Sequence, residues 1–231
     1  MKKKAHYLGW ELNFFDQSSN FRKYQNEFIF KHIGDYVAEV GPGNGENLLS
    51  YKDKVKKIDL FEPSLNLYNN LLKKFELENN ITFINEFFSV KKNKYDTIMY
   101  LDVLEHIKND KEELLNAYKS LKINGKLIIN VPAFEHLYSK FDKDVGHYRR
   151  YSKKTFLNLI NYLSPSSYKM IYYDNIGYFL SLVSKIFSTD YKKNFEQKIN
   201  FWNKLIPVSK IIDKVIFHSF GKSLIVIITK K

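Results

Sequence analysis

The chain has 231 residues and a formal net charge of +12. A chain of this length can form one α/β domain with a substantial core. It contains no cysteine, which excludes a disulfide framework and a thiolate metal site. The basic start Met1-Lys2-Lys3-Lys4 lacks the apolar stretch of a secretory signal, and no run reaches the ~20 apolar residues of a transmembrane helix. We therefore expect a cytoplasmic protein.

The charge comes almost entirely from lysine, since only three of the 37 basic residues are arginine. Such a charge is typical of proteins that bind nucleic acid or anionic membranes. The abundance of lysine and asparagine also fits a genome-wide codon bias, which weakens that interpretation. The arginines are then informative, and two of them are adjacent, Arg149 and Arg150. A retained guanidinium indicates a need for its planar fork, which pairs bidentately with carboxylate or phosphate.

The N-terminal segment is predicted to be an arm followed by a helix. Residues 5–20 show no clear hydrophobic period, whereas Phe21, Tyr24 and Phe28 fall at helical spacing up to a plausible stop at Gly34. Residues 1–34 therefore precede the predicted core, and the helix either covers a ligand or packs on a sheet.

A short apolar run at residues 35–40 predicts a buried strand that leads into a glycine loop. Gly41, Gly43 and Gly45 supply the positive φ and the close backbone approach that a nucleotide-like ligand requires. Glu46 and Asn47 follow where a P-loop would need Gly-Lys-Ser/Thr, which argues against phosphate binding. The spacing also differs from the Gly-x-Gly-x-x-Gly of dinucleotide enzymes.

Two acids next to this loop suggest the ligand. Glu39 directly precedes the glycines and suits a ligand with a cationic group. Glu62 ends the next apolar run, predicted as a strand over 55–61, at the offset where a carboxylate accepts ribose hydroxyls. Ribose without pyrophosphate, together with a positive charge, indicates S-adenosylmethionine.

Further strands and helices alternate along the chain. Strands are predicted at 81–84, 95–101, 126–131, 168–173 and 223–229, and helices over residues 67–75, 110–121 and 156–163. Asp110-x-x-Glu113 resembles a helix cap, and Gly125 is predicted to close the helix that follows it. This alternation predicts a parallel sheet with helices on both faces. Asp102 follows the 95–101 strand at its carboxyl end, where open α/β sheets bind ligands.

Three groups of residues together resemble the class I S-adenosylmethionine-dependent methyltransferases. They are Glu39-Val40-Gly41-Pro42-Gly43-Asn44-Gly45, Glu62, and Leu101-Asp102-Val103-Leu104-Glu105-His106-Ile107. The resemblance covers most of residues 35–132, the predicted cofactor-binding core. A later segment, Phe141-Asp142-x-x-Val145-Gly146-His147-Tyr148-Arg149-Arg150-Tyr151-Ser152, resembles a bacterial group of small-molecule methyltransferases associated with surface-polysaccharide or secondary metabolism.

The resemblance implies one Rossmann-like methyltransferase domain over 1–231, with a mostly parallel seven-stranded sheet and a helical insertion before the last strand. It implies S-adenosylmethionine as cofactor and S-adenosylhomocysteine as product. It places Glu86 near the adenine, where Asn85 competes for the role, and Asp102 beside the methionine part of the cofactor. It also suggests that Tyr24 helps to cover the cofactor.

Residues 133–151 are predicted to form the acceptor-site loop. His147 is our first candidate for a general base, because imidazole titrates near neutrality, and Asp102 and His106 are its rivals. A substrate-orienting or structural hydrogen bond is the alternative role of His147. We expect no metal, because the spacing of His136, Asp142 and His147 matches no standard ligand pattern.

Tyr148, Arg149 and Arg150 are candidates for binding the acceptor. The arginines would hold an anionic acceptor, or fix this loop through ion pairs with Asp142 or Asp144.

Residues 176–220 are predicted to be an insertion with two basic amphipathic stretches, 176–187 and 201–216. These could contact an anionic membrane surface peripherally, cap the acceptor pocket, or pack as ordinary helices on the domain.

Three functions remain open. The leading one is methylation of an oxygen on a small-molecule acceptor, a sugar or a phosphorylated precursor of a surface glycan. An RNA methyltransferase is favoured by charge alone, and Asp102-Val103-Leu104 stands where an Asn-Pro-Pro-Tyr-like base-flipping motif would be. A protein that binds the cofactor without catalysis is the third. The oligomeric state does not follow from the sequence.

Overall fold

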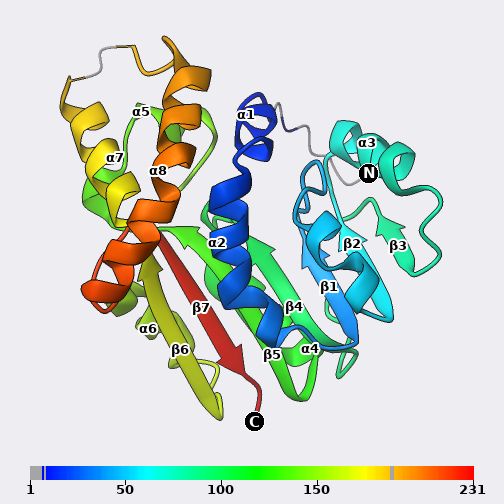
Figure 1. Cartoon of the computed structure of the whole chain (residues 1–231). Coiled ribbons are helices and arrows are strands. Elements are labelled where there is room, and N and C mark those ends of the chain that lie inside the picture. The colour runs from blue at the N-terminus through cyan, green and yellow to red at the C-terminus, as the bar shows by residue number, and fades with distance from the viewer. Residues whose placement is uncertain (1–6, 8, 188–189) are drawn as a thin grey trace.

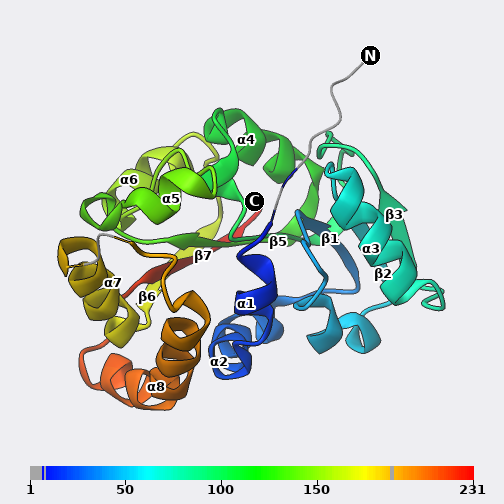
Figure 2. The ribbon, with the colours of Figure 1, turned by 90° about the horizontal axis from the view of Figure 1, so that it is seen from above.

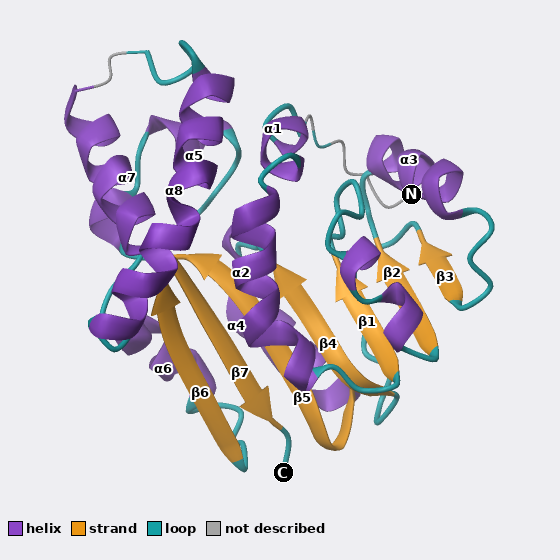
Figure 3. Ribbon diagram, in the orientation of Figure 1, coloured by secondary structure: helices purple, strands orange, loops and turns teal. Residues whose placement is uncertain are grey.

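The computed structural model of the chain describes residues 7, 9–187 and 190–231, and the basic start Met1–Lys4 lies outside these residues. Seven strands form one sheet in the order β3-β2-β1-β4-β5-β7-β6 (Figures 1 and 3). The strands are β1 Tyr36–Val40, β2 Lys57–Phe61, β3 Ile81–Ile84, β4 Tyr95–Leu101, β5 Leu121–Pro132, β6 Ser167–Tyr173 and β7 Ser223–Thr229. Only β7 runs antiparallel to its neighbours, which confirms the predicted mostly parallel seven-stranded sheet.

The helices cover both faces of the sheet, as Figure 2 shows from above. They are α1 Leu12–Asp16, α2 Ser19–Ile29, α3 Leu65–Phe75, α4 Asp110–Ser120, α5 Lys140–Asp144, α6 Lys153–Ile160, α7 Asn175–Phe187 and α8 Phe195–Val215. Short 3₁₀ turns are η1 Phe30–His32, η2 Leu48–Ser50, η3 Lys52–Lys54, η4 Leu104–His106 and η5 Glu135–Leu137.

Two hydrophobic cores follow from the alternation of side chains along the strands. In β7, Leu224 and Val226 point into the core beneath α4 and α6, whereas Ile225 and Ile227 point into the core beneath α2, α3 and α8. A strand buried on both faces reads as a continuous apolar run, which is why 223–229 was recognisable in the sequence.

Two details around α4 differ from expectation. The helix ends at Ser120, and Gly125 lies inside β5 rather than at the helix end. The prediction that Asp110 and Glu113 cap this helix is also wrong, because Asn109 is the N-cap residue. The Glu113 carboxylate accepts a hydrogen bond from the Tyr100 hydroxyl at 2.7 Å. Both acids serve tertiary contacts instead of the helix end.

The insertion before β7 is helical, as predicted, but its second helix begins at Phe195, before the expected 201. Tyr24 of α2 is buried and donates a hydrogen bond to Asp213 of α8 at 2.9 Å. Tyr24 therefore joins α2 to α8, whereas other residues of α2 reach the cavity described below. No helix among the described residues is long and apolar enough to cross a membrane.

Candidate active site

A cavity of about 1430 Å³ opens at the carboxyl edge of the parallel strands. It is lined by the glycine loop, by the end of β4, by residues 133–151 and by helices at both ends of the chain. Of the predicted site residues, the cavity brings together Gly41, Gly43, Glu62, Asp102, His106, His147 and Arg150.

The glycine loop presents its backbone to this cavity. Gly41 and Gly43 have φ values of +66° and +58°, which only glycine adopts readily. A Cβ atom on Gly41 would lie 2.8 Å from Cγ2 of Val103, so this turn has no room for a side chain. Gly45 has a different role, because a Cβ atom there would lie 2.6 Å from Cε2 of Phe75 in α3. Gly45 thus allows close packing of the loop on a helix and does not line the cavity.

Glu62 lies at the end of β2 and is almost fully buried, with its carboxylate at the cavity wall. Its Oε1 accepts a hydrogen bond from the backbone N–H of Ser64 at 2.9 Å. Burial raises the pKa of Glu62 to about 7, against the lowering effect of hydrogen bonds from Ser64 and Gly43. A carboxylate held in this way next to the glycine loop can accept hydrogen bonds from ribose hydroxyls.

Glu39 does not face the cavity as its position in the sequence suggested. Its side chain is buried and accepts a hydrogen bond from the Tyr51 hydroxyl at 2.5 Å. Burial raises the pKa of Glu39 to about 7, while the Tyr51 hydrogen bond and the Arg22 charge lower it. Glu39 therefore lies behind the cavity lining, and its contact with a cationic ligand group stays a prediction.

The burial of Glu39 predicts that Glu39→Gln stabilises the fold at high pH. Because its folded pKa of about 7 lies above the ordinary 4.5, the native protein binds more protons than the unfolded chain between these values. Wild-type stability contributed by this group is therefore lost as pH rises through that window, up to about 3 kcal/mol. Glutamine can still accept the Tyr51 hydrogen bond without titrating.

Urea unfolding at pH 5 and pH 8.5 measures this effect. The gain in unfolding free energy for Glu39→Gln should be small at pH 5 and large at pH 8.5, and the exposed Glu76→Gln should change neither value. An equal gain at both pH values would contradict the assignment of the titration to Glu39.

Glu86 is exposed. Its neighbours Phe87 and Phe88 line the cavity, whereas Glu86 is not among the described residues that do so. Asn85 donates a hydrogen bond from Nδ2 to the carbonyl oxygen of Glu62 at 2.8 Å. The position of Glu86 therefore does not match its predicted contact with adenine, and Asn85 supports the backbone of Glu62 instead.

Asp102 follows β4 with a φ of +59°, and its side chain is open to the cavity. Its Oδ1 accepts a hydrogen bond from Nδ2 of Asn130 at 2.8 Å, and Oδ1 of Asn130 accepts one from the Tyr173 hydroxyl at 2.9 Å. The protein atoms that surround the cavity desolvate the accessible Asp102 carboxylate and raise its pKa, while the bond from Asn130 lowers it. This chain of hydrogen bonds fixes the carboxylate between β4 and β5.

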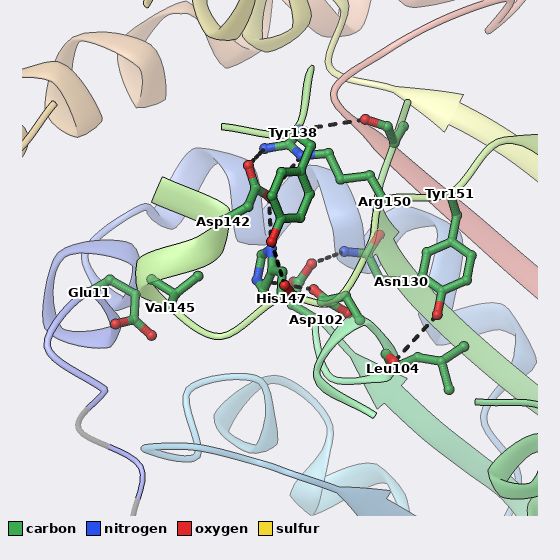
Figure 4. Close-up of polar contacts among 12 residues, drawn as sticks. Glu11, Asp102, Leu104, Asn130, Tyr138, Asp142, Val145, His147, Arg150 and Tyr151 are labelled. Carbon is green, nitrogen blue, oxygen red and sulfur yellow. Dashed lines mark hydrogen bonds and ion pairs between the residues drawn. The ribbon is translucent and has the colours of Figure 1, made fainter. Parts of the chain in front are cut away.

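Asp142 holds both His147 and Arg150, as Figure 4 shows. Its Oδ1 lies 2.8 Å from Nδ1 of His147 and 2.8 Å from Nε of Arg150, and its Oδ2 accepts from Nη2 of Arg150 at 3.0 Å. Burial by itself raises the pKa of Asp142, but the hydrogen bond from His147 and the charge of Arg150 bring it well below its usual range. A carboxylate only accepts hydrogen bonds, so Nδ1 of His147 carries a proton.

Residues 133–151 are therefore more ordered than the expected loop, since they contain η5 and the short helix α5. Ser139 and Asp142 form a capping box at the start of α5, which fixes the Asp142 carboxylate from a second side. The Tyr138 hydroxyl also donates to the carbonyl oxygen of His147 at 2.7 Å.

His106 and His147 meet edge to face, with ring centroids 4.6 Å apart, beside Glu105. Glu105, His106 and His147 each offer a ligand atom within 4.8 Å of the others. This group differs from His136, Asp142 and His147, whose spacing was compared with metal-ligand patterns in the sequence. Burial raises the pKa of Glu105 well above its usual value and lowers the pKa of His106 to about 3. The low pKa keeps His106 neutral at physiological pH, which is the form of imidazole that can ligate a metal, so the expected absence of a metal stays a prediction from the sequence. His136 instead contacts the Tyr178 hydroxyl at 3.0 Å.

The proposed acceptor residues Tyr148, Arg149 and Arg150 make contacts within the chain. Nη1 of Arg149 pairs with Asp110 at 2.8 Å, and Tyr148 is 54% exposed. Among the described residues that line the cavity, Arg150 occurs and the other two do not. The arginine forks thus bind carboxylates of this protein, which corresponds to the ion-pair alternative with Asp142 for Arg150.

Several other residues of the cavity wall carry no clear signal in the sequence. The N-terminal arm reaches it through Tyr7, whose backbone N–H donates to Oγ of Ser64 at 2.9 Å and whose hydroxyl donates to Glu11 at 2.6 Å. Lys222 enters from the turn before β7, with Nζ 4.1 Å from the centre of the Trp202 ring, and burial lowers its pKa. One lysine among 34 cannot be singled out by composition.

Comparison with known proteins agrees with this geometry. Residues 19–176, more than half of the chain, match the model of the family described as methyltransferase domain. The ribosomal RNA small subunit methyltransferase A of Fusobacterium nucleatum subsp. nucleatum is 27% identical over 136 residues, which cover 55% of this chain and 48% of the relative. The chain thus spans about half the length of the curated relative it matches.

Two solved structures share the fold at low identity. Phosphoethanolamine N-methyltransferase 2 of Haemonchus contortus has a TM-score of 0.64 and 16% identity, covering 99% of this chain and 59% of that protein. A SAM-dependent methyltransferase from Archaeoglobus fulgidus has a TM-score of 0.62 and 16% identity, covering 96% and 98%. The fold is that of a class I methyltransferase, and the chain belongs to the methyltransferase domain family.

Proposed function

We propose that this protein transfers a methyl group from S-adenosylmethionine to an oxygen of a small-molecule acceptor, a sugar or a phosphorylated precursor. The observation that carries the proposal is the joint lining of one cavity by the glycine loop, by Glu62 and by the Asp142-supported His147. The proposed cofactor cradle and the proposed base would therefore face the same space. The volume of about 1430 Å³ exceeds the 300–1000 Å³ typical of one small ligand, which leaves room for an acceptor.

The chain offers a fitting place for the cofactor, because its turn has no room for a side chain at Gly41 and Glu62 presents a carboxylate beside it. The Gly41 and Gly43 backbone would approach the cofactor, Glu62 would accept its ribose hydroxyls, and Asp102 would border its methionine part. S-adenosylmethionine supplies an electrophilic methyl group when it is bound. The protein's own contribution is alignment of the acceptor and exclusion of water.

His147 is proposed to take the proton from the acceptor hydroxyl. Because Nδ1 is occupied by the bond to Asp142, Nε2 is the nitrogen free to accept a proton. Arg150 keeps Asp142 ionised, and Asp142 in turn would stabilise the imidazolium that forms. His106, whose pKa of about 3 keeps it neutral, is a much weaker base than an ordinary histidine, and it would shape the wall beside His147.

Lys222 is proposed to attract an anionic group of the acceptor, such as a phosphate. Within the described part of the chain, Lys222 forms no ion pair shorter than 4.0 Å, although it lines the cavity. Arg149 and Arg150 are both committed to carboxylates of the protein. A cation without a partner ion in a cavity is better placed to bind an anion than one that is already paired.

Calorimetric binding of S-adenosylhomocysteine tests the cofactor assignment. Wild type should bind, and Glu62→Ala should weaken binding about 10- to 150-fold, because a hydrogen bond to a charged group contributes roughly 1.5–3 kcal/mol. The matched change Glu86→Ala, on an exposed neighbour outside the cavity lining, should leave affinity unchanged. Absence of binding to folded wild type would overturn the assignment. If wild type binds, turnover with a panel of acceptors separates an enzyme from a binding protein.

An RNA methyltransferase is the second candidate. It is favoured by the net charge of +12 and by the curated relative, whose printed name describes a ribosomal RNA methyltransferase. RNA binding whose affinity falls steeply with salt, together with methylation of RNA and not of small acceptors, would favour this candidate over the first.

A further inference from the structure

Helix α8 carries an apolar stripe on its outer side. Phe201, Val208, Ile211 and Val215 are 57%, 49%, 66% and 70% exposed, and their spacing places them on one face of the helix. The opposite face is buried through residues such as Trp202 and Ile206. A helix of a soluble protein normally has one apolar face, which packs on the core. This second stripe has no partner among the described residues of the chain.

Helix α7 repeats this feature. Phe179, Val183 and Ile186 stand at positions i, i+4 and i+7 and are 53%, 52% and 65% exposed, and Phe187 is 78% exposed. The two helices lie side by side at the carboxyl edge of the sheet in both views of the ribbon (Figures 1 and 2). The helices that carry these exposed apolar side chains therefore lie together at one end of the molecule, and exposed apolar surface on neighbouring elements marks an interaction site.

The same helices carry positive charge. Residues 175–217 contain seven lysines and three acidic residues. One of the acids, Asp213, is buried and accepts hydrogen bonds from the backbone N–H groups of Asp174 and Asn175. Lys204 and Lys214 of α8 are exposed, whereas Lys210 pairs with Glu27 of α2. Exposed lysines on the helices that carry the apolar side chains match an interface of anionic lipid headgroups over hydrocarbon, where each lysine near the surface adds about 1 kcal/mol of attraction. A protein partner would not require this combination.

The exposed apolar side chains continue into the cavity. Val183, Phe187 and Phe201 are exposed and also line the cavity wall. Further inside, the wall that α7 and α8 contribute includes the apolar or aromatic side chains Leu180 and Phe195. The cavity thus has a polar end at Glu62 and Asp102 and a mostly apolar end at α7 and α8, where Lys185 and Lys198 also line the wall.

We propose that α7 and α8 dock on an anionic lipid surface, and that the apolar end of the cavity takes the hydrocarbon chain of an amphiphilic acceptor. The second half of this inference rests on the proposed function, whereas the first half does not. Lys222, at the inner side of α8 beside Trp202, lies where it would meet a charged headgroup while the chain extends toward α7. This assigns the acceptor to the class of lipid-linked or lipid-like anions.

Co-sedimentation with lipid vesicles tests the docking surface. The full chain should bind vesicles of mixed phosphatidylcholine and phosphatidylglycerol, and only weakly bind phosphatidylcholine alone. The triple change Ile186→Glu, Ile211→Glu and Val215→Glu, none of which lines the cavity, should reduce binding at least about tenfold. A control triple of Leu49→Glu, Leu77→Glu and Ile123→Glu adds the same charge at exposed apolar residues elsewhere and should reduce it far less.

The docking surface is refuted if wild type does not bind the mixed vesicles, or if both triple variants lose binding equally. It is also refuted if light scattering finds a wild-type dimer that the first triple converts to monomer without any vesicle binding. S-adenosylhomocysteine should bind both triple variants as it binds wild type. Failure of the cofactor assignment would appear in this calorimetric measurement on wild type, independently of the vesicles.

Binding of dodecanoate below its micellar concentration tests the apolar end of the cavity. Dodecanoate should bind wild type, acetate should not, and Ser184→Trp on the cavity side of α7 should abolish dodecanoate binding while S-adenosylhomocysteine still binds. Ser181→Trp is a second way to fill the same space. Dodecanoate that binds wild type and both variants alike, or that does not bind wild type, would refute the chain-binding half.

Discussion

His147→Gln should lower kcat by about 10²- to 10⁴-fold, the usual contribution of a positioned general base. Glutamine keeps a hydrogen-bonding side chain near Asp142 but cannot take up the acceptor proton. The affinity for S-adenosylhomocysteine should stay close to that of wild type, because the glycine loop and Glu62 are untouched. Steady-state kinetics with any acceptor that turns over, together with calorimetry, measures both quantities.

Two companion variants separate catalysis from structure. His136→Gln is the matched control, since His136 lies on the same segment but contacts Tyr178 at the surface, and it should leave kcat unchanged. Asp142→Asn removes the carboxylate that favours a proton on Nδ1 of His147, so it should lower kcat and shift the pH profile. An increase in KM alone for His147→Gln would show that His147 orients the acceptor rather than taking its proton.

Arg150→Ala should destabilise the folded protein by about 3–5 kcal/mol. The reason is that Asp142 is fully buried, so loss of the bidentate guanidinium leaves a buried carboxylate whose remaining side-chain partners are His147 and Ser139. Arg150→Lys should cost less, because it retains the charge but loses the planar fork. Urea unfolding at pH 7 measures these differences.

Arg149→Lys is the control for this prediction. Its guanidinium is partly exposed in the pair with Asp110, and lysine keeps the charge, so the change should cost about 1 kcal/mol or less. If Arg150→Ala instead left the stability unchanged and raised KM only for anionic acceptors, Arg150 would bind the acceptor.

The RNA interpretation and the small-molecule interpretation differ in the residues they make important. Binding of RNA through net charge would depend on many surface lysines at once, and no single one would dominate. Binding of one anionic group in the cavity would depend on Lys222, so Lys222→Met should raise the KM of an anionic acceptor without changing the salt dependence of RNA binding. This single variant distinguishes the two modes.

The sequence by itself determined the order of strands and helices along the chain, the mostly parallel sheet and the cofactor loop. These features depend on local chemistry. Buried β-strands are recognised by their apolar runs, and the loop is recognised by Gly41 and Gly43, which adopt a backbone conformation that other residues rarely adopt. Glu62 was identifiable because a carboxylate at the end of the second strand of such a sheet lies next to the loop by topology alone.

Only the tertiary structure decided which side chains meet. Glu39 accepts a hydrogen bond from Tyr51, Arg150 pairs with Asp142, and Gly45 packs against Phe75. Each of these three residues stands in a motif that suggested contact with a ligand. Tyr7 and Lys222, far apart in the sequence, line one cavity because both chain ends pack at the carboxyl edge of the sheet. Hydrophobic period and turn chemistry specify each element locally, whereas side-chain partners depend on where distant elements pack, and that is set by the whole core at once.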